Sequence, residues 1–151
     1  MASNLNLFTF EKVTIDGESG YKISANNYYE LAGKITLPDT YKNPETNEVK
    51  KVLSIGDFSR NYEIKAVYFL NANTCSYKII EDGGGFGTNG LMYEEAKLER
   101  IYLPETITYI GSNAFYNCKY LTLEKLPDST KTIGSYAFYG CEKINIDAIG
   151  V

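Results

Sequence analysis

Apolar residues in the second half of the chain recur with a period of 23 residues, and not with the 3.6-residue period of a helix. Residues 98–120 and 121–143 align without gaps and are identical at 10 of 23 positions. The identical residues include apolar residues suited to an interior, a proline that ends a strand and a glycine suited to a bend. A unit this short cannot bury its own apolar side chains, so the pattern predicts a solenoid of stacked copies.

Alternation of side chains predicts one short strand in each turn of the solenoid, which we call a rung. In the first repeat, Ile101 and Leu103 are expected to point inward. In the second repeat Glu124 stands where Ile101 stood. This strand is therefore expected to bulge, with Leu123 taking an inward place.

Weaker copies of the repeat precede these two. Residues 52–69 match the second half of one unit and the strand of the next. Residues 80–86 resemble the Ile-Gly bend, stretched by an insertion over residues 71–97. The solenoid is therefore expected to begin well before residue 98.

The N-terminal residues show a different pattern. Residues 8–15 alternate as strands do, and residues 21–23 are expected to return after a polar turn, which predicts a β-hairpin. We predict a mainly β fold, with an N-terminal hairpin cap over residues 1–34 and a solenoid of about three to four rungs over residues 35–151. The two parts are expected to pack as a single compact unit.

The residues of the first repeat carry a resemblance to a known family. The pattern L-x-x-I-x-L-P-x-x-I-x-x-I-G-x-x-A-F-x-x-C, read over residues 98–118, resembles the BspA-type leucine-rich repeat. The resemblance implies a leucine-rich-repeat solenoid. It also implies a module for adhesion and protein binding on cell surfaces, and similar repeats occur in bacteriophage-encoded proteins.

Charge and composition remove several classes of function. The net charge is −4, and the 15 basic residues are spread singly, so we expect neither a nucleic-acid partner nor attraction to anionic membranes. The chain has no histidine, which excludes Ser-His-Asp, Cys-His and HExxH chemistry. The three cysteines have no CxxC spacing, so we expect no metal site and no cofactor.

Two cysteines occupy one repeat position. Cys118 and Cys141 are expected on neighbouring rungs about 4.8 Å apart, which permits a disulfide. The odd number of cysteines and a cytoplasmic context favour reduced thiols instead, buried as small apolar groups. Cys75 lies outside the repeat and has no assigned role.

The outward face of the strands is the candidate recognition surface, because repeat proteins bind through an extended sheet face and Tyr and Arg are favoured anchors. If alternation continues undisturbed into the second repeat, Leu123 points outward instead of inward. The alternative to a binding surface is a solvated sheet with ordinary cross-strand pairs. The candidate residues are Tyr68, Arg100, Tyr102, Leu123 and Lys125.

The C-terminal edge is a candidate assembly surface. Residues 144–151 are rich in apolar side chains, whereas solenoids normally shield a terminal rung with a polar cap. We expect Ile144, Ile146, Ile149 and Val151 to dock against a second copy or a larger assembly. The alternative is a disordered terminus.

Three classes of function remain. Residues 1–7 resemble neither a secretory signal nor a membrane span, so we expect a cytoplasmic or virion protein without membrane insertion. The favoured function is a non-enzymatic module that binds a protein or a host-surface ligand, as a homo-oligomer or within a larger assembly, most specifically as a structural or adhesion component of a virion. One alternative is an intracellular or cell-surface adhesin module. Another is an enzyme with a carboxylate or tyrosine site near residues 71–97.

Overall fold

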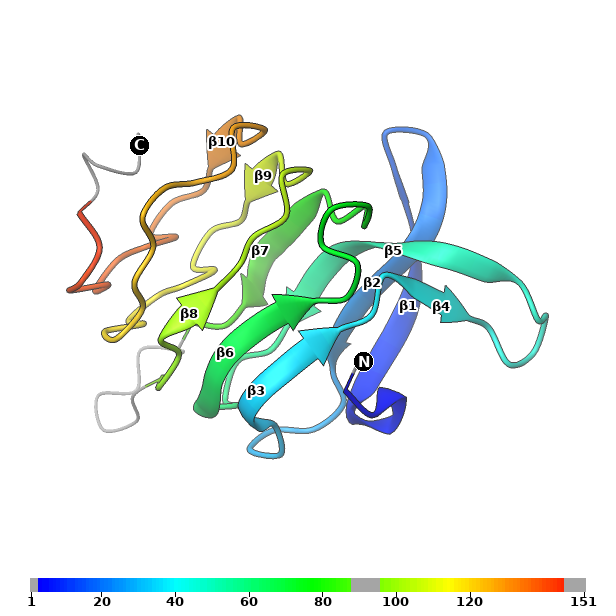
Figure 1. The fold of residues 1–151 in the computed structure, drawn as a ribbon, viewed down its shortest axis with the longest axis horizontal. Helices are drawn as coiled ribbons and strands as arrows, with labels where there is room; N and C mark the ends of the chain where they lie inside the picture. The colour runs from blue at the N-terminus through cyan, green and yellow to red at the C-terminus, as the bar shows by residue number, and fades with distance from the viewer. Residues whose placement is uncertain (1–2, 88–95, 146–151) are drawn as a thin grey trace.

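The computed structural model describes residues 3–87 and 96–145 as two β-sheets that enclose one core (Figure 1). A short 3₁₀ helix, η1 (Leu5–Leu7), precedes the strands. The strands are β1 (Phe8–Ile15), β2 (Glu18–Ala25), β3 (Ala32–Leu37), β4 (Thr40–Lys42), β5 (Val49–Asp57), β6 (Glu63–Phe69), β7 (Ile79–Gly85), β8 (Arg100–Ile101), β9 (Tyr109–Ile110) and β10 (Thr132–Ile133).

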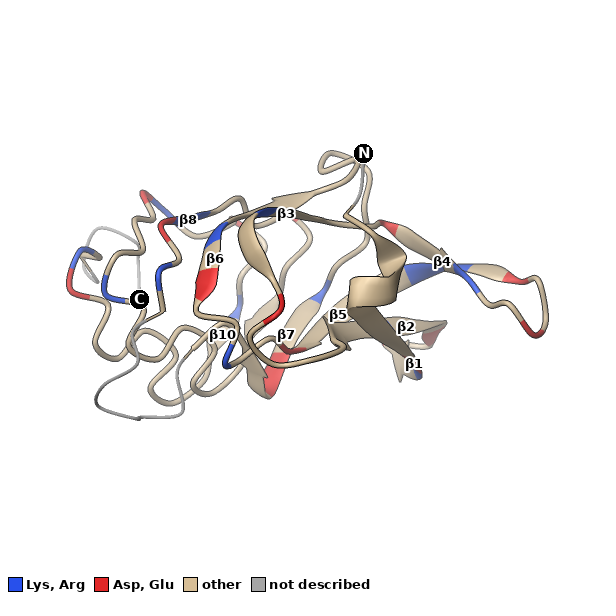
Figure 2. Cartoon of the chain, turned by 90° about the horizontal axis from the view of Figure 1, so that it is seen from below, with Lys and Arg blue, Asp and Glu red and all other residues tan. Residues whose placement is uncertain are grey.

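From β2 to β9 the chain alternates between the two sheets. Sheet A has the order β1-β2-β5-β7-β9-β10, with β4 paired to β5, and sheet B has the order β3-β6-β8. The pairs β1–β2 and β4–β5 are antiparallel, and all other pairs among the described residues are parallel. Figure 2 shows the two sheets as separate layers. The predicted mainly β solenoid with an N-terminal β-hairpin is therefore confirmed.

Columns of aliphatic side chains join the rungs within each sheet. In sheet A the column is Ile23, Ile55, Ile80, Ile110 and Ile133, each in register with the next. In sheet B it is Ile35, Val67 and Ile101. Burying such a side chain stabilises a fold by about 1.5–3 kcal/mol. The repeat holds its period because each rung has to present an aliphatic residue to the same column.

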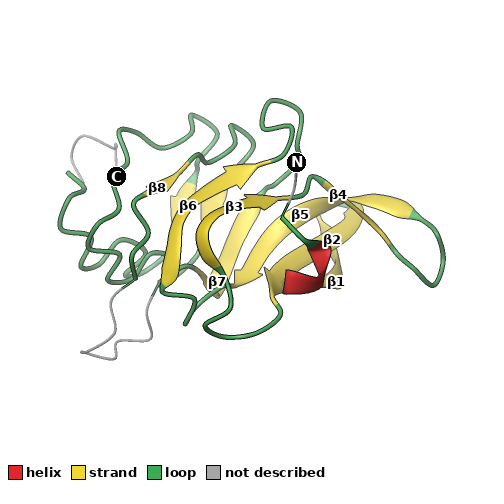
Figure 3. Cartoon of the chain, turned by 60° about the horizontal axis from the view of Figure 1, so that its bottom comes forward, coloured by secondary structure: helices red, strands yellow, loops and turns green. Residues whose placement is uncertain are grey.

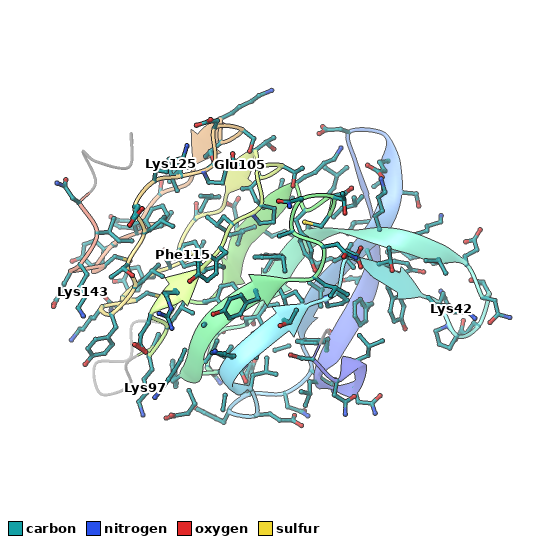
Figure 4. All side chains as sticks on the ribbon, in the orientation of Figure 1. Lys42, Lys97, Glu105, Phe115, Lys125 and Lys143 are labelled. Carbon is teal, nitrogen blue, oxygen red and sulfur yellow. The ribbon has the colours of Figure 1, made fainter. Side chains whose placement is uncertain are left out.

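A column of phenylalanine rings runs between the sheets. It consists of Phe8, Phe58, Phe86, Phe115 and Phe138, and successive ring centroids lie 6.1, 5.0, 6.1 and 5.3 Å apart. Figure 4 shows Phe115 within the interior. The predicted match of residues 80–86 to the repeat holds at both ends, because Ile80 pairs with Ile110 and Phe86 stacks on Phe115. The residues between them belong to strand β7 and not to a bend.

A glycine allows strand β7 to approach the next rung. Gly85 has a φ of +78°, and a Cβ atom there would lie 2.5 Å from the carbonyl oxygen of Ala114. The amide of Phe86 donates to that same oxygen at 2.7 Å. A side chain at residue 85 would therefore separate the rungs that this hydrogen bond joins.

The N-terminal hairpin belongs to the same sheet as the solenoid. Strand β2 pairs with β5, and Ile23 is the first member of the sheet A column. The division of the chain at residue 34 stays a prediction. In the C-terminal part of the described chain, strands are short and loops predominate (Figure 3).

Candidate functional site

A groove opens on the outer side of sheet B where two consecutive rungs part. The Thr122 amide and hydroxyl both donate to the carbonyl oxygen of Glu99, at 3.0 and 3.1 Å. Beyond Thr122 no further backbone hydrogen bond joins residues 100–103 to residues 123–126, all of which the structure describes. Residues 121–126 accordingly form no strand. The two segments diverge and leave a groove of about 380 Å³.

The residues of the groove come from both segments. It is lined by Arg100, Ile101, Tyr102, Leu103, Glu105, Thr122, Leu123, Glu124, Lys125 and Pro127. Four of the five predicted sheet-face residues are among them. The fifth, Tyr68, stacks on Tyr102 of the neighbouring rung with ring centroids 5.1 Å apart, which is a cross-strand pair of the kind expected on a sheet face. The structure therefore brings the predicted surface residues together, whereas their role in binding stays a prediction.

Leu123 is placed inward, as the substitution of Glu124 for Ile101 indicates. Leu123 is half-buried and packs against the core, whereas Glu124 is exposed. The outward placement of Leu123 by strict alternation is therefore wrong, because a carboxylate at the inward position would lose its hydration. The exposed part of Leu123 still contributes apolar surface to the groove.

The charged groups of the groove differ in whether they already have a partner within the protein. Lys125 Nζ lies 3.3 Å from Asp128 Oδ1, and Glu105 Oε2 accepts a hydrogen bond from the Asp128 amide at 2.9 Å. Figure 4 labels Lys125 and Glu105 near one end of the rungs. The backbone of Arg100 pairs with strand β6. The side chains of Arg100 and Glu124 form no hydrogen bond or ion pair with any described residue, so their charges remain available to a ligand.

A search of protein families gives one match to this region. Residues 88–149 match the family described as "BspA type Leucine rich repeat region (6 copies)". These residues are therefore similar to a BspA-type leucine-rich repeat region. The resemblance predicted from residues 98–118 is therefore confirmed. No curated protein matches the chain.

One solved structure extends the leucine-rich-repeat fold over most of the chain. The structure of a leucine-rich repeat protein of T. pallidum is similar with a TM-score of 0.52 and 19% identity, over 95% of this chain and 69% of the other. A leucine-rich cell surface protein of Faecalibacterium prausnitzii aligns with a TM-score of 0.32 and 14% identity, over 96% of this chain and 53% of its own length. The first similarity shows a shared fold.

The last described rung of the leucine-rich repeats is less covered than the rung before it. Ile133 is half-buried whereas Ile110 is inaccessible to solvent, and Phe138 is 7% exposed whereas Phe115 is not exposed. Ile144, one of the predicted assembly residues, is buried. The other three, Ile146, Ile149 and Val151, lie outside the described residues, and the assembly role of all four stays a prediction.

The thiols are buried and unpaired. Cys118 Sγ lies 3.6 Å from the carbonyl oxygen of Phe86, and Cys141 Sγ lies 3.0 Å from that of Phe115. Burial raises the pKa of Cys118 well above its usual value and raises the pKa of Cys141 to about 12. Cys75 is also buried, and burial raises its pKa. Neutral thiols of this kind are unreactive and act as small apolar groups.

One carboxylate–tyrosine pair joins Asp82, within the insertion over residues 71–97, to Tyr109. The Tyr109 hydroxyl and the Ser112 amide both donate to Asp82 Oδ1. The hydrogen bond from Tyr109 lowers the pKa of Asp82, and the same bond raises the pKa of Tyr109. General acid–base catalysis needs pKa values near the working pH, and both values move away from it. The described residues also contain no cluster of three or more potential metal ligands.

The sequence interpretation missed a cluster of exposed tyrosines. Tyr116 and Tyr139 stack with centroids 5.1 Å apart, and Tyr136 meets Tyr139 edge to face at 5.6 Å. Tyr136 and Tyr139 are 63% and 56% exposed. Tyr116 and Tyr139 occupy the same position in the two repeats, and this is the sequence signal that points to the cluster.

Proposed function

We propose that the chain is a non-enzymatic recognition module that binds a protein partner through the groove on sheet B. The main support is that the groove is lined by Arg100, Tyr102, Leu123 and Lys125. Two rungs separate there, and their facing backbone groups form no hydrogen bonds to one another. Tyr and Arg are the residues most often found as binding anchors. Tyr68 extends the surface by its stacking on Tyr102.

An extended segment of the partner suits the chemistry of the groove. The facing sides of residues 100–103 and 123–126 form no backbone bonds to one another, so a partner strand can use these donors and acceptors. Leu103 and Leu123 offer apolar contact between the unpaired charges of Arg100 and Glu124. A segment with one acidic and one basic side chain around apolar residues would satisfy both charges.

Three observations support a binding role over an enzymatic one. The chain has no histidine. Asp82 is exposed and Tyr109 is half-buried, and the pKa shifts of this pair oppose acid–base chemistry. The repeats of this chain resemble BspA-type leucine-rich repeats, and this resemblance implies protein binding. No helix within the described residues is long and apolar enough to cross a membrane.

More specifically, we propose that this module is a structural or adhesion component of a virion and not an intracellular or cell-surface adhesin. This proposal rests on the occurrence of similar repeats in bacteriophage-encoded proteins. Neighbouring genes for capsid, portal or tail proteins would support the virion assignment. Neighbouring genes for surface anchoring or export would contradict it.

The test of the groove compares two double variants. Arg100→Ala with Tyr102→Ala removes two groove residues, and Lys12→Ala with Tyr139→Ala removes a cation and an equally exposed tyrosine elsewhere. A partner captured from host lysate is purified and its affinity for each protein is measured by calorimetry. The groove variant should lose at least about 2 kcal/mol, which is about 30-fold, and the control should bind as wild type. Equal affinity of the groove variant and wild type would refute the proposal.

A further inference from the structure

A polar pocket lies far from the groove, where the chain passes from sheet A to sheet B in the first two rungs. Two loops form it, the one that follows β2 and the one that follows β5 (Figure 1). Its volume is about 310 Å³, at the lower end of the range for small-molecule sites. The lining residues are Ala25, Asn26, Asn27, Tyr28, Asp57 and Ser59.

A buried asparagine fixes the two loops relative to one another. The Asn61 side chain is 6% exposed, and its Oδ1 accepts from the amides of Glu30 and Leu31 at 3.1 and 3.0 Å. Its Nδ2 donates to the carbonyl oxygens of Asn27 and Ser59, both at 3.2 Å. Both loops that form the pocket are therefore bonded to one side chain, and a ligand would not have to order them on binding.

The backbone beside the pocket adopts an unfavourable conformation in both loops. Tyr29 has a φ of +63° and Arg60 a φ of +62°, and the Tyr29 amide donates to the Arg60 carbonyl at 3.0 Å. L-amino acids other than Gly, Asn and Asp seldom adopt this left-handed region. Such residues persist where the surrounding structure determines them, and they cluster at ligand-binding sites.

The pocket retains unused hydrogen-bonding capacity. Asp57 Oδ1 accepts from the Ser59 amide at 2.8 Å, and Oδ2 has no partner among the described residues. The same holds for the side-chain oxygens of Asn26 and Asn27 and for the Tyr28 hydroxyl. The Arg60 guanidinium lies over the Tyr28 ring, 4.7 Å from its centroid, as a cation–π contact.

We infer that this pocket binds a neutral saccharide. Asp57 is the only charged side chain of the lining, and the other polar groups are two carboxamides and two hydroxyls. A sugar hydroxyl both donates and accepts, so adjacent hydroxyls can use the free carboxylate and amide oxygens together with the Ser59 and Tyr28 hydroxyls. An ammonium group would use the acceptors alone, and an anion would be repelled by Asp57. The volume accommodates one sugar ring.

The experiment follows backbone amides by ¹H–¹⁵N NMR during titration with glucose, galactose, mannose and N-acetylglucosamine, each at millimolar concentration. N-acetyl-lysine amide serves as the cationic probe. At least one sugar should produce saturable shifts at the amides of Asn26, Asn27 and Ser59. Asn26→Ala should weaken this binding about five- to tenfold because one hydrogen bond is lost. Asn73→Ala, at an exposed loop asparagine elsewhere, should leave it unchanged.

A second variant separates the saccharide from a cation. Asp57→Asn keeps an acceptor for the Ser59 amide and for a hydroxyl but removes the charge, so sugar binding should persist and any binding of N-acetyl-lysine amide should be lost. If none of the four sugars produces saturable shifts at the pocket, the inference is wrong. It is also wrong if only the cationic probe binds and Asp57→Asn abolishes that binding. None of these outcomes depends on the groove of sheet B.

Discussion

At the scale of single residues, the phenylalanine column shows how one side chain serves two rungs. Phe115 contacts Phe86 on one side and Phe138 on the other, with ring planes within 20° of parallel in both pairs. Each ring therefore covers the next, and an interior ring is removed from water on both faces. The sequence indicates this role, because Phe115 and Phe138 occupy one position of the repeat and each follows a small alanine.

Phe115→Ala is expected to reduce the free energy of unfolding by about 3–5 kcal/mol, because the ring is fully buried and its loss leaves a cavity between two others. Urea unfolding of the two proteins measures the change. Tyr139→Ala, which truncates an exposed ring, is the control and should cost under about 1 kcal/mol. A similar loss for both variants would place Phe115 outside the packed interior.

The buried thiols predict a stability that depends on pH. The folded pKa values of Cys118 and Cys141 exceed the unfolded value of about 8.5, so the folded state keeps its protons where the unfolded state loses them. Their contribution is complete below about pH 8.5 and declines as pH rises, by at most about 1.4 kcal/mol per pH unit for each thiol. Urea unfolding at about pH 7.5 and 9.5 measures this slope.

The variant Cys118→Ala with Cys141→Ala should remove most of the slope, because alanine does not titrate. Maleimide labelling provides an independent check: both thiols should react only after denaturation. Rapid labelling of the native protein would contradict the buried position of Cys118 and Cys141.

At the scale of elements, sheet A and sheet B differ in how their strands continue. Sheet A keeps its isoleucine column through the last described rung, whereas sheet B loses its ladder after β8. The cause is local, because the second repeat carries Glu124 at the position of Ile101. A polar residue at an inward position cannot be buried in the core, so this segment does not pair with β8 as a strand. The groove lies between the two unpaired segments.

Hydrogen exchange should report this difference. The amides of Ile55 and Ile80 lie in central strands of sheet A and should exchange slowly. The amides of Leu123 and Lys125 have no backbone partner in the described part of the chain and should exchange faster by orders of magnitude. The measurement is NMR detection of exchange into D₂O. Equal protection at both places would mean that a sheet B strand forms here in solution.

The sequence predicted sheet B better than sheet A. Apolar and polar side chains alternate clearly along residues 64–69 and 100–103. This alternation defines which residues face outward, and Tyr68 and Tyr102 do so as neighbours. Strands β9 and β10 have two residues each, too few for alternation to be visible, and their isoleucines were interpreted as parts of a bend. The polar pocket could not be predicted, since it depends on the hydrogen bonds of Asn61 between two loops.

The N-terminal edge of sheet A carries charges that oppose self-association. Strand β1 pairs only with β2 among the described residues, and Glu11 and Lys12 stand near its centre. A symmetric antiparallel pair of β1 strands places a residue opposite its own copy. Centring on Glu11 or Lys12 would therefore oppose like charges, which is a common protection of edge strands.

At the scale of the whole molecule, the two ends of the solenoid are unequal. Charged side chains are dispersed over the surface, with both signs interspersed (Figure 2). The N-terminal end has a charged edge strand, whereas the last described rung leaves Ile133 partly exposed. Self-association through sheet A is therefore expected at the edge around Ile133 and not at strand β1.

The prediction is that the chain elutes as a dimer or larger oligomer, and that Ile133→Lys converts it to a monomer by placing a charge in the apolar contact. Size-exclusion chromatography with light scattering measures the mass. Val49→Lys changes an exposed apolar residue of the β4–β5 hairpin and should leave the mass unaltered. A wild-type monomer at micromolar concentration would contradict the prediction.

The columns of isoleucine and phenylalanine also define how such a chain can change in length. Each column requires one residue from every rung, so a duplication of 23 residues adds a complete member to all columns and leaves their phase intact. An addition of any other length shifts the phase unless it leaves the stack as a loop between strands. The repeat length is thus the unit in which this scaffold can grow or shorten, and its surfaces can be spaced apart in steps of one rung, about 4.8 Å.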